Sequence, residues 1–173
     1  MLSSDLITIS NDPVVILRRA TSNDVEFVKD LFIKTMNSVV SVAWNGRFRW
    51  KSWFNDAEEA IQDEKHMFFI VRELEEDVGF IWMNEYQTTL WITAIILEEQ
   101  WQRRGIGGQI MQMLIEVCKD NGKDALELGV QQNNQAALNF YQKIGFVKYD
   151  TIRSAGTDLL RLELKKRKNL TYS

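Results

Sequence analysis

The segment from Leu90 to Gly108 reads LWITAIILEEQWQRRGIGG and joins an apolar run, a polar loop and a glycine-rich turn. Aliphatic residues dominate 90–97, which predicts a strand. The polar residues 98–104 predict a loop, and apolar side chains at helical spacing over 110–118 predict a helix after the glycines. A strand, a short loop and a helix that starts on glycine therefore follow one another directly.

A glycine-rich turn before a helix is suited to binding an anion. Glycine lets the backbone turn sharply and approach a ligand closely, and successive N–H groups at a helix start attract negative charge. Arg103 and Arg104 add positive charge beside the turn. The Gly-Lys-Ser/Thr ending of a P-loop is missing, and Ile110 replaces the third glycine of the dinucleotide-binding pattern. The glycines alone indicate either a phosphate or pyrophosphate site or a plain turn.

Hydrophobic patterns on both sides of this segment predict one α+β domain. Strands are expected at 14–17, 67–71, 78–83, 90–97, 126–130, 146–149 and 158–164, and helices after Thr21, over 56–64, over 110–118 and from Asn134 to Gly145. A charged turn at 73–77 joins two strands as a hairpin, so the sheet is expected to be largely antiparallel. We expect a flexible arm over 1–12, the domain over 13–166 and a tail over 167–173.

The composition argues against several classes of protein. The 173 residues are 45% hydrophobic and 26% charged, which is typical of one globular domain. With 21 Lys and Arg against 24 Asp and Glu, the net charge of −3 argues against a nucleic-acid partner bound through bulk charge. The single cysteine, Cys118, and the single histidine, His66, exclude an internal disulfide and the usual zinc and redox motifs, so no metal site is expected.

The sequence also gives an expectation about localisation. No apolar run approaches the length of a membrane span, and the first ten residues lack the pattern of a signal peptide. One unpaired cysteine fits a reducing compartment. We therefore expect a cytoplasmic protein without a membrane partner.

Three separate segments resemble the GNAT superfamily of acetyl-CoA-dependent N-acetyltransferases. Gln102, Gly105 and Gly107 match the Gln-x-x-Gly-x-Gly spacing of its acetyl-CoA motif. Residues 134–146 resemble its Asn-x-x-Ala-x-x-x-Tyr-x-x-x-Gly-Phe segment, and residues 17–24 are similar to its first strand and helix start. The resemblance implies a GNAT-type fold, with a mixed, mostly antiparallel sheet of about seven strands, splayed between the fourth and fifth, and about four flanking helices.

The resemblance further implies acetyl-CoA as the cosubstrate. Backbone amides of the turn, from Gln102 to Gly108, would hold the pyrophosphate, and the strand before it would bind the pantetheine arm. The acetyl carbonyl would lie near the amides of Ile96 and Leu97, and Asn134 would touch the arm from the other side of the splay. The implied cofactor-binding residues are Ile95, Ile96, Leu97, Gln102, Arg103, Arg104, Gly105, Ile106, Gly107, Gly108, Asn134 and Tyr141.

Tyr141 is the general acid that the resemblance implies, because a phenol beside the sulfur can protonate the leaving thiolate. Its other interpretation is an aromatic residue of the core. The acceptor amine must lose a proton before it attacks, and Glu85 and Glu98 are the candidate bases. The other interpretation of each glutamate is a solvated surface carboxylate, which is the more common case.

The aromatic segment 44–54 lies where related enzymes build the acceptor side of the site. Core packing explains many of these residues, and Trp44, Phe48 and Trp50 are the candidates for contact with an amine. We expect direct transfer from acetyl-CoA to a primary amine of a small molecule in a ternary complex. The alternatives are a peptide or protein amine as acceptor, or a non-catalytic acyl-CoA-binding sensor. The resemblance is also compatible with a homodimer.

Overall fold

The computed structural model describes residues 7–9, 15–43, 48–63 and 65–164. Its strands are β1 (Ile7–Ile9), β2 (Val15–Arg19), β3 (Met67–Glu73), β4 (Glu76–Glu85), β5 (Thr89–Leu97), β6 (Ala125–Gln131), β7 (Val147–Ile152) and β8 (Thr157–Glu163). Its α-helices are α1 (Val25–Ala43), α2 (Trp50–Gln62), α3 (Ile106–Asp120) and α4 (Gln135–Ile144). The predicted α+β class is confirmed. None of the described helices is long and apolar enough to cross a membrane.

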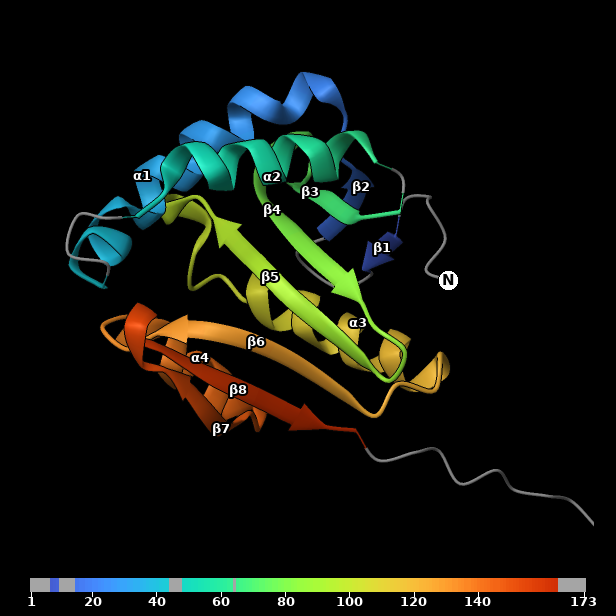
Figure 1. Cartoon of the computed structure of the whole chain (residues 1–173). Coiled ribbons are helices and arrows are strands. Elements are labelled where there is room, and N and C mark those ends of the chain that lie inside the picture. The colour runs from blue at the N-terminus through green and yellow to red at the C-terminus, as the bar shows by residue number, and fades with distance from the viewer. Residues whose placement is uncertain (1–6, 10–14, 44–47, 64, 165–173) are drawn as a thin grey trace, which may run out of the picture.

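The strands form one sheet in the order β1-β2-β3-β4-β5-β6-β8-β7. Neighbouring strands are antiparallel except β5 and β6, which run parallel and pair only from Thr89↔Ala125 to Ile92↔Leu128. Beyond that point the two strands diverge toward their C-terminal ends (Figure 1). The predicted splay is confirmed. It falls between the fifth and sixth strands because β1 precedes the strand that the sequence placed first.

The short strand β1 lies within the segment that the sequence predicts as a flexible arm. Ile7 pairs with Leu17 and Ile9 with Val15, so the segment extends the sheet by one antiparallel strand. Three residues are too few for hydrophobic periodicity to reveal a strand. Over the described residues the sheet therefore has eight strands, one more than the seven that the sequence predicts.

Helices cover both faces of the sheet. α1 and α2 lie on one face, and α3 and α4 lie on the other (Figure 1). The core on the α1/α2 face holds Phe68, Phe80 and Trp82, whereas Met83 and Ile92 belong to the core on the α3/α4 face. Successive residues of β4 thus face opposite sides, as a pleated strand requires.

The start of α1 is fixed by a local set of hydrogen bonds. The N–H and hydroxyl of Thr21 donate to Asp24 Oδ2 at 2.8 and 3.0 Å, and Arg18 donates to both carboxylate oxygens of Asp24 at 2.9 and 2.7 Å. Burial raises the pKa of Asp24, but the bonds from Arg18 and Thr21 outweigh it and leave that pKa below its ordinary value. Thr21 thus stands at the helix start that the sequence predicts.

α2 begins at Trp50, earlier than the helix predicted over 56–64. Trp50, Trp53 and Phe54 turn toward α1, where the rings of Phe32 and Trp53 stack with centroids 3.6 Å apart. The charged residues Asp56, Glu58 and Glu59 mark only the solvated face of the helix. Burial of the aromatic rings against α1 extends it toward the N-terminus.

A bulge at Thr93 interrupts β5. The register between β4 and β5 shifts from Trp82↔Ala94 to Met83↔Ile92, which leaves Thr93 as an extra residue. The bulge directly follows Ile92, the last residue of β5 that pairs with β6. Because a bulge bends a strand and increases its twist, it accounts for the divergence of β5 from β6 at this position.

Candidate active site

The turn before α3 presents a series of unbonded backbone N–H groups. Arg103 and Gly105 both have positive φ, 59° and 88°. The N–H of Gln109 bonds back to Gly105 O at 3.0 Å. Within the described part of the chain, none of the six N–H groups from Arg103 to Gly108 donates to a protein acceptor. Consecutive donors at the N-terminus of a helix form a site that attracts an anion.

Gln102 ties this turn to the preceding strand. Its Nε2 donates to Leu97 O at 2.9 Å, and its backbone N–H donates to Glu99 O at 3.2 Å. The family resemblance predicts that the Gln102 amide is among those that hold the pyrophosphate. The structure instead engages that amide inside the loop, so the unbonded series starts at Arg103.

Arg104 is held between two groups. Its Cζ lies 4.2 Å from the centroid of the Trp101 ring, and its Nη2 lies 3.8 Å from Glu73 Oε1. Glu73, the last residue of β3, is 2% exposed, and its Oε2 has no hydrogen-bond partner within the described residues. A buried carboxylate is costly without a counter-charge, so Glu73 acts as an anchor for Arg104.

The edge of β5 offers backbone groups to the splay at alternate residues. Glu98 N–H donates to Val78 O of β4 at 2.9 Å, and the register places Ile96 at the next paired position along β4. Backbone groups of successive strand residues point to opposite neighbours. Ile95 and Leu97 therefore face the gap, whereas Ile96, predicted to present its amide to the acyl group, faces β4.

α4 packs against the start of α3, beside the turn. A Cβ placed on Gly107 would lie 3.3 Å from the Phe140 ring, so the start of α3 and α4 are in close contact. The ring centroids of Phe140 and Tyr141 lie 5.1 Å apart. Tyr141 is 6% exposed, and burial raises the pKa of its hydroxyl, which stays protonated at neutral pH. Asn134 caps α4 by accepting from Ala137 N–H at 3.2 Å.

The two candidate bases lie at opposite ends of β5. Glu85 pairs with Leu90 near the start of the strand, and its Oε1 accepts from Lys123 Nζ at 2.8 Å. The seven residue-to-residue steps from Leu90 to Leu97 span about 23 Å, so the structure does not bring Glu85 to the turn. Glu98 follows the C-terminal end of β5 and accepts from Gln100 Nε2 at 3.0 Å.

Phe48 and Trp50 lie between α1 and α2. The ring centroid of Phe32 is 6.0 Å from that of Phe48 and 5.7 Å from that of Trp50. Both side chains are partly buried against the core of this face. Core packing therefore explains their positions, and the third candidate for substrate contact, Trp44, lies outside the described residues.

A polar chain on the α1/α2 face was not anticipated from the sequence. His66 Nδ1 lies 3.2 Å from Asn84 Oδ1, and Asn84 Nδ2 donates to Thr93 Oγ1 at 2.7 Å. The chain ends on the bulge where β5 leaves β6. The sequence indicates this polar chain only through Thr93, a hydroxyl-bearing residue inside the apolar run 90–97.

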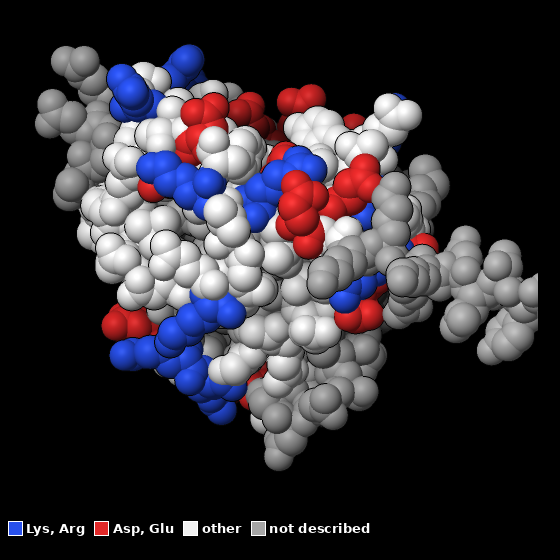
Figure 2. Space-filling view, turned by 90° about the horizontal axis from the view of Figure 1, so that it is seen from below, with Lys and Arg blue, Asp and Glu red and all other residues white. Residues whose placement is uncertain are grey.

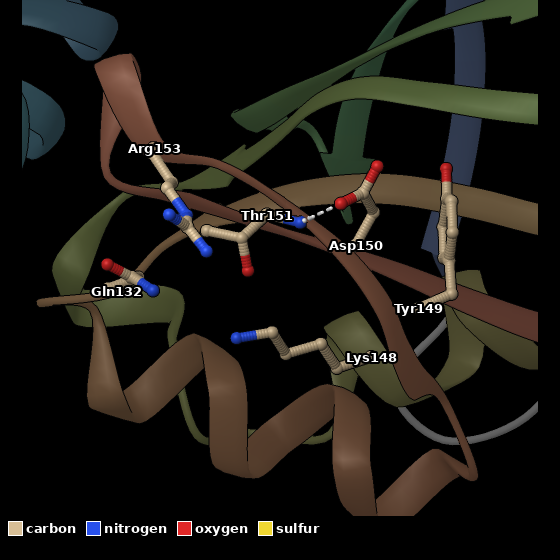
Figure 3. A pocket seen from close by; sticks show the side chains of 6 residues that line it. All are labelled: Gln132, Lys148, Tyr149, Asp150, Thr151 and Arg153. Carbon is tan, nitrogen blue, oxygen red and sulfur yellow. Dashed lines mark hydrogen bonds between the residues drawn. The ribbon is translucent and has the colours of Figure 1, made fainter.

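A separate surface cavity of about 680 Å³ lies at the outer edge of the sheet and is lined by Gln132, Lys148, Tyr149, Asp150, Thr151 and Arg153 (Figure 3). The buried Asp158 beside it accepts from Lys148, Gln132 and Thr151 at 2.8, 2.8 and 3.0 Å. The hydrogen bond from Lys148 is the main cause of the lowered pKa of Asp158. This cavity belongs to β7 and its neighbours, and none of its lining residues comes from the turn before α3.

Charge is mixed on the face shown in Figure 2. Basic side chains lie there in separate groups, with acidic side chains beside several of them. The net charge of the whole chain is −3. An anion that reaches the turn is therefore attracted by local groups, the unbonded amides together with Arg103 and Arg104, rather than by the net charge.

The splay and the unbonded turn both lie within a segment that matches a known protein family. The Acetyltransferase (GNAT) family matches residues 26–146 of this chain, which include both the turn and α4. The chain belongs to the GNAT acetyltransferase family. Its fold is similar to the crystal structure of the PaiA N-acetyltransferase of Thermoplasma acidophilum in complex with coenzyme A, with a TM-score of 0.67 and 17% identity over 86% of this chain and 98% of that chain.

Two relatives illustrate the range of the sequence similarity. An uncharacterized N-acetyltransferase of Methanocaldococcus jannaschii is 23% identical over 79% of this chain and 62% of its own length. The L-amino acid N-acyltransferase MnaT of Escherichia coli is 30% identical over 37% of this chain and 37% of its own length. The chain thus spans 62% or less of the length of these relatives.

Proposed function

We propose that this protein transfers the acetyl group of acetyl-CoA directly to a primary amine of a small molecule, with both substrates bound together. The observation that carries the proposal is the series of six unbonded N–H groups, Arg103 to Gly108, beside the open edge of β5. Such a series suits a pyrophosphate. Family membership and the coenzyme A complex of the similar PaiA structure support acetyl-CoA as the cosubstrate.

The residues around the splay have distinct parts in this proposal. Acetyl-CoA supplies a thioester, which is an activated acyl group. The amides of Ile95 and Leu97 face the gap, and either of them can donate to a carbonyl oxygen that gains negative charge. The amine nitrogen bonds to the carbonyl carbon and the carbon–sulfur bond breaks. The phenol of Tyr141 gives its proton to the sulfur, and the proton that the amine nitrogen loses passes through solvent and restores the phenol.

The single cysteine supports direct transfer over a covalent acyl-enzyme route. Cys118 is 2% exposed, and burial raises the pKa of its thiol to about 11. A buried, protonated thiol is a poor nucleophile. The burial of Cys118 therefore supports attack by the amine on the thioester itself.

One relative supports a small acceptor, and one structural neighbour, the ribosomal-protein-S18-alanine N-acetyltransferase of Escherichia coli, is named for a protein acceptor. The E. coli relative is named as an L-amino acid N-acyltransferase, which acts on a small amine. Its match covers 37% of this chain. The acceptor class therefore needs a direct test.

Replacement of Tyr141 by phenylalanine tests the proposal, because it removes only the hydroxyl. We expect turnover to fall by about 100-fold, the scale of general-acid catalysis, while the affinity for acetyl-CoA is kept. Calorimetric titration with acetyl-CoA and a thiol-release assay over a panel of amines measure the two effects. Tyr149→Phe, at a tyrosine that is 49% exposed on β7, serves as the matched control.

The outcomes separate the competing functions. Wild-type protein that binds acetyl-CoA but releases no thiol with any small amine or peptide would be a sensor rather than an enzyme. Thiol release with peptides alone would identify the acceptor as a peptide or protein. Failure to bind acetyl-CoA would refute the proposal.

A further inference from the structure

The ring of Phe140 lies between the turn before α3 and the tyrosine that serves as the acid in the proposed reaction. A Cβ placed on Gly107 would lie 3.3 Å from Phe140 Cζ and 3.7 Å from Phe140 Cε2. Gly107 belongs to the first turn of α3 and Phe140 to α4, and both helices lie on the same face of the sheet (Figure 1). The missing side chain at Gly107 therefore lets this ring approach the turn closely.

This contact distinguishes Gly107 from the two glycines beside it. A Cβ on Gly105 or Gly108 would meet nothing within 4 Å. Gly107 lies inside α3 and its φ is not positive, so its backbone conformation does not require a glycine. Alanine is the better helix former at such a position. The close approach of Phe140 is thus a reason for a glycine at this position that is independent of any bound anion.

The orientation of Tyr141 depends on neighbouring rings. Its hydroxyl makes no hydrogen bond within the described part of the chain. Its ring packs edge to face against Phe140, with centroids 5.1 Å apart, and against Phe146, with centroids 5.4 Å apart. Aromatic pairs of this geometry are stabilising. Ring packing rather than a hydrogen bond therefore sets the direction of the hydroxyl.

Of these two rings, only that of Phe140 would also lie within 4 Å of a Cβ on Gly107. Protein interiors are close-packed and transmit strain, so a displacement of the turn moves Phe140 and, through it, the ring of Tyr141. The N–H of Gly107 is one of the unbonded groups that suit a pyrophosphate. The coenzyme site and the acid thus share one aromatic contact.

We propose that Phe140 is a positioning residue, which holds the hydroxyl of Tyr141 near the sulfur of a coenzyme bound at the turn. Phe140 gives no proton and no hydrogen bond, and it acts through its packing on both neighbours. The inference rests on the proposed function, in which Tyr141 protonates the leaving sulfur. It predicts that a change at Phe140 lowers kcat rather than the affinity for acetyl-CoA.

A double-mutant cycle with Tyr141 tests the inference. Phe140→Leu shortens the side chain and withdraws it from Gly107 and from Tyr141. We expect kcat for thiol release to fall about tenfold, as for a misplaced general acid, with the dissociation constant for acetyl-CoA nearly unchanged. In protein that carries Tyr141→Phe, the same change should leave the residual kcat as it is, because the hydroxyl that Phe140 positions is gone. Purely structural damage would lower kcat in both backgrounds.

A second cycle tests the contact with the turn and keeps the Phe140 side chain. Gly107→Ala places a Cβ 3.3 Å from the Phe140 ring, which must give way. We expect kcat at saturating acetyl-CoA to fall severalfold, but not when Phe140→Leu is also present, because the shorter side chain leaves room. Phe27→Leu, at a partly buried ring packed against the core on the opposite face of the sheet, is the matched control and should keep the wild-type kcat. Thermal unfolding checks that each variant is folded.

Four results would overturn the inference. Two of them are an unchanged kcat in Phe140→Leu and an equal loss of kcat with and without the Tyr141 hydroxyl. The third is an effect of Gly107→Ala on kcat that is the same in both Phe140 backgrounds. The fourth is a loss of acetyl-CoA affinity alone, which would show that Phe140 contacts the coenzyme itself. Failure of the wild-type protein to bind acetyl-CoA, or full turnover by Tyr141→Phe, is a different result and refutes the proposed function instead.

Discussion

Gly105 and Gly108 have different roles although only two residues lie between them. Gly105 has φ of 88°, in the left-handed region, whereas Gly108 lies inside α3. A Cβ on either residue would meet nothing within 4 Å. The two positions therefore differ in backbone conformation and not in the room available for a side chain.

This contrast gives a prediction for two identical substitutions. Gly105→Ala should lower the free energy of unfolding by about 1–2 kcal/mol, because a Cβ is strained at this φ. It should also weaken acetyl-CoA binding, because relief of the strain turns the amides of the loop. Gly108→Ala should stabilise the protein by about 0.5 kcal/mol, since alanine is the better helix former. Urea denaturation measures the free energy of unfolding of both variants, and calorimetric titration measures acetyl-CoA binding. Equal changes in the free energy of unfolding of the two variants would contradict the argument.

The turn before α3 depends on an element that is distant in sequence. Glu73 ends β3, and its carboxylate, 2% exposed, faces Arg104 at 3.8 Å. Arg104 in turn covers the Trp101 ring. The buried charge thus links the end of a central strand to the loop that starts α3.

Replacement of Glu73 by glutamine should therefore separate stability from binding. The melting temperature should stay the same or rise, because the change removes the desolvation cost of a buried charge that has one distant partner. The dissociation constant for acetyl-CoA should nevertheless increase severalfold, since Arg104 loses its anchor. Thermal unfolding and calorimetry measure the two quantities, and Glu75→Gln in the exposed hairpin turn is the control. A loss of stability without weaker binding would contradict the anchoring role.

At the scale of the whole molecule, the buried Cys118 can report unfolding. Burial raises its thiol pKa to about 11, so the thiolate fraction is small at pH 8 and grows only as the pH rises toward that value. We expect a disulfide reagent at pH 8 to react with the native protein on the order of 100-fold more slowly than with a small thiol. Addition of urea should remove this protection.

The same thiol tests whether the coenzyme stabilises the entire domain. If Cys118 reacts only through global unfolding, acetyl-CoA at 100 times its dissociation constant should slow the reaction by a further factor of about 100. Reaction rates with and without acetyl-CoA give this factor. Rapid labelling at pH 8 without denaturant would show that α3 opens locally.

Local sequence patterns determined most of the elements and the position of the turn before α3. Alternation and helical spacing act over a few residues, so they placed β3, β4, β5 and α3 and indicated residues 105–108 as a candidate anion site. They did not reveal β1, whose three residues are too short for periodicity. They also did not reveal the start of α2 at Trp50, which depends on burial against α1.

Only the tertiary structure decided which groups face one another across the splay. The bulge at Thr93 sets the register of β5 against β4, and that register turns Ile95 and Leu97 rather than Ile96 toward the gap. The same packing pairs Glu85 with Lys123 far from the turn and joins His66, Asn84 and Thr93 into one chain. Strand register and long-range contacts depend on residues far apart in the chain, so no local pattern specifies them.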